Sequence, residues 1–169
     1  MYGSAMELFL SKESLNLHLS YLNDLKLKYS ILEKSLPCEK VRNFRSSLCD
    51  LKRDAQRLLR EISLHEIYFS SFSEKNRKCE FLKRYYSSKE AFLYEIYIKA
   101  KSCASSFLTI TVGKTGKPFV CETENLDSLE PCLALDLSEH AYFSDYAFNR
   151  DEYVRRALSY MDFSKLENN

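Results

Sequence analysis

The chain has 169 residues, of which 45% are hydrophobic and 29% are charged, a composition typical of a globular protein that buries a sizeable core. Its formal net charge of +1 gives no basis for nucleic-acid binding or for a strongly acidic partner. No apolar stretch approaches the roughly 20 residues of a membrane-spanning helix, and the six cysteines lack Cys-x-x-Cys spacing, so we expect a cytoplasmic protein with reduced thiols and no membrane partner.

The first predicted element is a long helix that begins near Ser11 and ends before Pro37. The tetrapeptide Ser-Lys-Glu-Ser at its start supplies a capping residue. Residues at spacings of three and four form one apolar face: Leu15, His18, Leu22, Leu25, Tyr29 and Leu32. A histidine therefore stands in a stripe that is otherwise apolar.

A second helix is predicted from just after Pro37 into the low seventies. Its apolar face is formed by Leu48, Leu51, Ala55, Leu58, Ile62, His65, Phe69 and Phe72. Two long helices in succession predict an antiparallel helical hairpin, which we assign to residues 6–75 as a first domain. Here too a histidine, His65, interrupts the stripe.

Two facing histidines in apolar stripes call for a physical explanation. A buried imidazole without a partner costs about 1–3 kcal/mol, so His18 and His65 are explained if they bind something in common. The alternative for His18 is a core histidine whose ring nitrogens meet backbone carbonyls.

Residues 76–169 are predicted to form a second domain of mixed structure. Its elements are a helix at 88–101, strands at 107–112, 119–122 and 132–136, and a helix at 151–160. The turn Gly-Lys-Thr-Gly should join the first two strands as a hairpin. We therefore expect an α+β fold, in which an N-terminal antiparallel helical hairpin is followed by a C-terminal part with helices around a small three-stranded antiparallel sheet.

The third predicted strand ends in a carboxylate, Asp136, and His140 follows four residues later. Three imidazoles and one carboxylate form a donor set that suits a metal ion. The alternative is a strand end followed by a helix cap beside a histidine that is satisfied in the core.

The sequence DLSEHAYFSDYAFNRDEYV, residues 136–154, resembles the C-terminal ligand signature of the iron/manganese superoxide dismutases. Ser138 stands where that family has Trp, and Asp151 stands where it has Pro. The segment SKESLNLH at 11–18 resembles the first ligand segment of the family, and LHEIYF at 64–69 resembles the second.

This resemblance implies a set of roles. The ligands of an iron or manganese ion would be His18, His65, Asp136 and His140. The substrate would be superoxide. The resemblance also implies a homodimer in which Glu139 reaches His140 of the partner subunit.

The residues expected around the ligands depart from the family pattern. Lys26 takes the place of a tyrosine at the entrance to the metal, and Glu61 takes the place of a glutamine that holds solvent at the metal in the iron type. In the manganese type that glutamine would fall on Leu126. We treat Lys26 and Glu61 as candidate catalytic residues, with solvated surface charges as the alternative.

Two function classes stay open at this point. The first is a metal-dependent superoxide dismutase-like oxidoreductase with altered residues around its ligands. The second is a metal-binding relative without dismutase activity, in a structural, sensing or other redox role.

Overall fold

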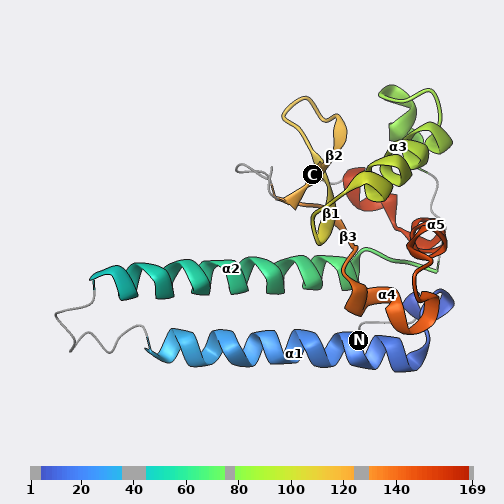
Figure 1. Ribbon diagram of the computed structural model, residues 1–169. Helices are drawn as coiled ribbons and strands as arrows, with labels where there is room; N and C mark the ends of the chain where they lie inside the picture. The colour runs from blue at the N-terminus through green and yellow to red at the C-terminus, as the bar shows by residue number, and fades with distance from the viewer. Residues whose placement is uncertain (1–4, 36–44, 75–78, 124–129, 168–169) are drawn as a thin grey trace.

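Two long helices, α1 (Lys12–Ser35) and α2 (Arg45–Ser70), lie side by side in the computed structural model (Figure 1). The model describes residues 5–35, 45–74, 79–123 and 130–167. The predicted start of α1 is confirmed, because the Ser11 hydroxyl accepts a hydrogen bond of 3.1 Å from the backbone N–H of Ser14. The predicted beginning of the second helix, just after Pro37, falls outside the described residues.

The C-terminal half contains an antiparallel sheet of three strands, β1 (Phe107–Val112), β2 (Pro118–Glu122) and β3 (Leu133–Asp136). Their order is β2-β1-β3, so β1 is central, and Thr109 pairs with Cys121 on one side and Ala134 on the other. The predicted hairpin of the first two strands is therefore confirmed. Its turn requires a glycine at Gly116, whose φ of 78° lies in the left-handed region.

The C-terminal half also contains three helices, the second of which packs against α1 (Figure 1). They are α3 (Lys89–Ser102), α4 (Glu139–Tyr146) and α5 (Arg150–Tyr160). Short 3₁₀ helices lie at η1 (Met6–Leu8), η2 (Glu80–Arg84) and η4 (Phe163–Glu167). The predicted α+β fold is confirmed. Among the described residues, none of the helices is both long and apolar enough to cross a bilayer.

Helix α4 was not among the predicted elements. It spans only 8 residues, and its C-cap residue Ala147 has a φ of 48°, which a non-glycine residue rarely adopts. This short helix places His140 in its first turn, so the histidine points from a helix rather than from an irregular segment after the strand.

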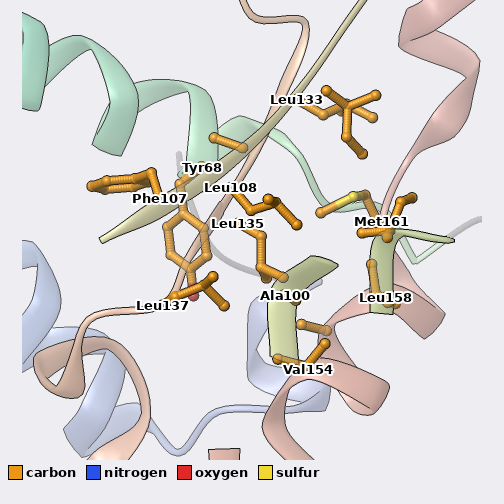
Figure 2. Close-up of a cluster of buried hydrophobic side chains, with 14 of the residues drawn as sticks. Tyr68, Ala100, Phe107, Leu108, Leu133, Leu135, Leu137, Val154, Leu158 and Met161 are labelled. Carbon is orange, nitrogen blue, oxygen red and sulfur yellow. The ribbon is translucent and has the colours of Figure 1, made fainter. Parts of the chain in front are cut away.

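The main core lies where the sheet meets the end of α2 and the helices α3 and α5. Figure 2 shows buried side chains from these elements in one cluster, with Tyr68 of α2, Leu135 of β3 and Val154 of α5 among them. The end of α2 is also tied to the segment that follows α5, because the backbone N–H of Asp162 donates to the carbonyl of Ser71 at 2.8 Å. The division into domains at 6–75 and 76–169 stays a prediction.

Candidate metal centre

Four elements bring the four candidate ligands to one place. His18 comes from α1, His65 from α2, Asp136 from the end of β3 and His140 from α4, and one donor atom of each lies within 4.8 Å of all the others. The first three side chains are 0% exposed, whereas the His140 side chain is 30% exposed. Three of the four candidate side chains are thus buried, and His140 is the one that is partly exposed.

The distances between the donor atoms match a shared ion. Asp136 Oδ2 lies 3.1 Å from His18 Nε2, 3.4 Å from His65 Nε2 and 3.2 Å from His140 Nε2. Ligands that bind one ion at about 2.0–2.2 Å, with angles of about 90–120° between them, are separated by about 3–4 Å. The atoms therefore surround a point that suits a metal ion of ordinary size.

Unsatisfied polar atoms support the same interpretation. Three buried atoms make no hydrogen bond within the described structure: the two ring nitrogens of His18 and Oδ2 of Asp136. Each such atom costs about 1–3 kcal/mol if it stays unpaired. A cation coordinated by His18 Nε2 and Asp136 Oδ2 removes this cost for those two atoms, and a mixed imidazole and carboxylate set suits iron or manganese.

The orientation of His65 is fixed from behind by the α2 backbone. Its Nδ1–H donates to the carbonyl of Glu61, one turn earlier, at 2.8 Å. This tautomer leaves the lone pair of Nε2 directed at the cluster. Burial lowers the pKa of His65, and the nearby Asp136 carboxylate opposes that shift only in part, so the ring is neutral and able to coordinate.

Asp136 is held at both its side chain and its backbone. Its Oδ1 accepts from the backbone N–H of Ser138 at 2.8 Å, and its carbonyl accepts from the Tyr153 hydroxyl at 2.8 Å. Tyr68 lies 3.1 Å from that hydroxyl and donates to it. Burial by itself would raise the pKa of Asp136, but its contacts with His140 and His18 outweigh burial and hold the pKa well below the usual range. The carboxylate is therefore ionised and has one oxygen free.

Aromatic rings enclose the buried histidines. The Phe69 ring lies 4.9 Å from the ring of His18, and the Phe107 ring lies 4.9 Å from that of His65, measured between centroids. These rings exclude water and strengthen electrostatic interactions inside the site.

The two other residues singled out from the sequence lie in different settings. Glu61 accepts a hydrogen bond of 2.7 Å at Oε1 from the Tyr21 hydroxyl, beside the cluster. Lys26 Nζ instead lies 2.6 Å from Glu66 Oε1 in an ion pair whose side chains are 44% and 43% exposed. Leu126 lies outside the described residues.

Tyr21 was missed in the sequence analysis. Its ring lies over His140, with centroids 4.2 Å apart and an interplanar angle of 30°. One signal was available, because Tyr21 follows His18 by three residues and so shares its face of α1. Burial, followed by the hydrogen bond to Glu61, raises the pKa of Tyr21 well above its usual value, so the hydroxyl remains a donor.

Comparison with known proteins gives a consistent result. Residues 74–169 match the model of a family described as iron/manganese superoxide dismutases, C-terminal domain. An iron superoxide dismutase from Bacteroides fragilis (strain YCH46) is 28% identical over 116 residues, which cover 61% of this chain and 60% of that protein. The chain thus spans about three fifths of the length of this relative. Because the family model covers more than half of the chain, the protein belongs to the iron/manganese superoxide dismutase family.

Proposed function

We propose that this protein is a metal-dependent superoxide dismutase whose ion is held by His18, His65, Asp136 and His140. The observation that carries the proposal is the convergence of four donor atoms, two of which, His18 Nε2 and Asp136 Oδ2, are buried without a hydrogen bond. Membership of the family supports the same activity.

An iron or manganese ion bound there would supply one-electron chemistry, because it alternates between two oxidation states. In the overall reaction two superoxide anions and two protons become dioxygen and hydrogen peroxide. The protein's own contribution is to hold three imidazoles and one carboxylate in fixed positions and to keep bulk water away from the buried side chains.

The approach of superoxide is proposed to occur on the His140 side of the cluster. His140 is the ligand whose side chain is 30% exposed, whereas those of His18 and His65 are 0% exposed. We further propose that Lys26 adds positive charge near this approach. Because Lys26 is paired with Glu66, its effect on the encounter with a small anion is modest and depends on salt.

Glu61 is proposed to act from beside the cluster, through its contacts with Tyr21 and His65. Its carboxylate is held by Tyr21 and its backbone carbonyl holds His65. Replacement of Glu61 by glutamine keeps the shape and removes a negative charge, so it should alter the redox behaviour of the site more than its metal content.

A homodimer with Glu139 close to His140 of the partner subunit is part of the proposal. Glu139 is exposed at the start of α4, and on the same helix Phe143 is 44% exposed. Phe148 follows α4, is 90% exposed and lies 5.3 Å from Phe143 between ring centroids. Exposed aromatic side chains beside the helix that carries His140 are typical of a surface that a second copy of the protein covers. A monomer by light scattering at micromolar concentration would count against it.

A cytoplasmic location is also proposed. The cysteines for which the structure gives a state are free thiols: Cys49, Cys79, Cys103, Cys121 and Cys132. Free thiols persist in a reducing compartment.

One observation favours the second candidate function, a metal site without dismutation. Lys26 is held by Glu66 on the surface, so the entrance lacks the tyrosine that the family places there. The ion would then serve mainly to join α1, α2, β3 and α4.

The two candidates are separated by one set of measurements. Protein purified without added metal is analysed for iron and manganese and assayed for dismutation, together with the variants Asp136→Asn and His65→Ala. Bound metal and activity in the wild type, both lost in the variants, support the dismutase. Bound metal without activity supports the structural role, and undiminished metal in both variants overturns the ligand set.

A further inference from the structure

We propose that Tyr21 is a positioning residue of the metal centre, whose ring orients His140 and whose hydroxyl orients Glu61. The inference rests on the proposed metal site and adds a residue that neither the ligand pattern nor the family match identified. It explains how two of the ligands keep their orientation at the most open side of the cluster.

The ring of Tyr21 is the first part of the argument. His65 has a backbone acceptor behind its ring, at the carbonyl of Glu61. For His140, the hydrogen-bond and ion-pair contacts that the structure gives are those of Nε2 with His65 and Asp136, and its ring face is covered by Tyr21 at 4.2 Å. A partly exposed imidazole turns about its side-chain bonds unless packing restrains it, so the Tyr21 ring sets its orientation.

The hydroxyl of Tyr21 is the second part. It donates to Glu61 Oε1 at 2.7 Å and so links α1 to α2 across 40 positions of the chain. The carbonyl of the same Glu61 receives the Nδ1–H of His65. Tyr21 therefore touches His140 directly and is connected to His65 through one residue.

The sequence spacing of these four residues explains why they meet. Tyr21 follows His18 by three residues on α1, and Glu61 precedes His65 by four residues on α2. Residues three and four apart lie on the same face of a helix, so both pairs point into the space between the helices. The two ligands and the two supporting residues are brought together when α1 and α2 pack.

Tyr29 provides a matched control on the same helix. Its hydroxyl donates to Glu33 at 3.4 Å, within α1 and on an exposed part of the helix. It is thus a tyrosine bonded to a glutamate without contact with a ligand.

The test uses full-length protein loaded with manganese or with iron and the variants Tyr21→Phe, Tyr21→Leu and Tyr29→Phe. Folding of each is checked by circular dichroism. Three quantities are measured: the electron paramagnetic resonance spectrum of the bound metal, the rate of metal loss to EDTA, and kcat and KM for superoxide.

We expect Tyr21→Leu to lose metal about 10-fold faster than the wild type, because residues that support ligands typically contribute 10–100-fold to metal affinity. Tyr21→Phe keeps the ring, so metal loss stays near the wild-type rate, whereas the spectrum changes and kcat falls with KM unchanged. In a Glu61→Gln background the change caused by Tyr21→Phe should be smaller, since the two groups act through one hydrogen bond. Tyr29→Phe should match the wild type throughout.

The measurements distinguish failure of the proposed metal site from failure of the role proposed for Tyr21. A wild type that binds neither iron nor manganese overturns the metal site and this role with it. A wild type that binds metal and dismutates superoxide, beside Tyr21 variants with unchanged spectrum, metal loss and kcat, overturns the role of Tyr21 alone. If Tyr21→Leu does not fold, the spectrum and kcat of Tyr21→Phe decide the matter.

Discussion

Tyr153 donates a hydrogen bond of 2.8 Å to the backbone carbonyl of Asp136, and both residues are 0% exposed. Helix α5 thereby holds the end of β3, from which the only carboxylate of the proposed ligand set extends. The position of Asp136 in the candidate metal centre therefore depends on how α5 packs against the rest of the C-terminal half.

Replacement of Tyr153 by phenylalanine should therefore destabilise the protein. The change leaves the Asp136 carbonyl and the Tyr68 hydroxyl without their buried partner, at a cost of about 1–3 kcal/mol. Urea unfolding measures this effect, with Tyr94→Phe as the control because Tyr94 is 65% exposed. Equal unfolding free energies for the two variants would contradict the role assigned to this hydrogen bond.

The contact between Ser11 and Asp145 predicts a dependence of stability on pH. The Asp145 carboxylate accepts a hydrogen bond of 2.7 Å from the backbone N–H of Ser11 and so joins the start of α1 to α4. Burial by itself would raise the pKa of Asp145, but the hydrogen bonds from Ser11 outweigh burial and hold it below 3.8.

A carboxyl whose pKa is lower in the folded state stabilises the fold above its unfolded-state pKa and loses that contribution as the pH falls through the folded-state pKa. Asp145→Asn should thus be less stable than the wild type by a constant amount above about pH 5, and the difference should shrink below about pH 4. Urea unfolding at a series of pH values checks this. A difference that stays the same down to about pH 3 would be inconsistent with the ionised contact.

Removal of the metal should lower the melting temperature. The proposed ion would join four elements, and without it His18 Nε2 and Asp136 Oδ2 are buried and make no hydrogen bond. A ligand at about 1,000 times its Kd adds about 4 kcal/mol of stability, so reloaded protein should unfold at a clearly higher temperature than protein treated with EDTA. His65→Ala should show little difference between the two conditions. A wild type with the same melting temperature in both would exclude a stabilising ion.

The charge of Lys26 should affect the rate of encounter and not the chemistry. In Lys26→Met we expect kcat/KM for superoxide to fall a few-fold at low ionic strength and to approach the wild-type value in high salt, because salt screens exposed charges. Lys28→Met, at an exposed position on the same helix, is the matched control. If both variants behave alike at every salt concentration, Lys26 has no special place on the approach path.

The four candidate ligands could be singled out from the sequence for a physical reason. Apolar spacing of three and four defined the buried faces of α1 and α2, so His18 and His65 stood out as polar residues within them. Asp136 ends an apolar strand and His140 follows four residues later, and the structure brings all four side chains together. The apolar periodicity of single helices and strands was sufficient to single out these residues, because each of them lies on a regular element or directly beside one.

The surroundings of the ligands could not be predicted in this way. Whether Glu61 meets Tyr21 or solvent depends on how α1 and α2 rotate against each other, and an apolar stripe fixes that rotation only approximately. Lys26 and Tyr21 are both near the edge of the buried face, yet one pairs with Glu66 and the other covers His140. Helix α4 was missed because 8 residues of mixed polarity contain too few turns for a clear period.

The separation of the ligands along the chain has a consequence for synthesis of the protein. His65 and His140 are 75 residues apart, so at a translation rate of about 5–20 residues per second the ribosome needs roughly 4–15 s to make the stretch between them. During that interval the helical hairpin carries two imidazoles and an uncovered apolar face. The proposed set of ligands is complete only after α4 has been made, so the nascent chain would acquire its full affinity for the proposed ion late in its production.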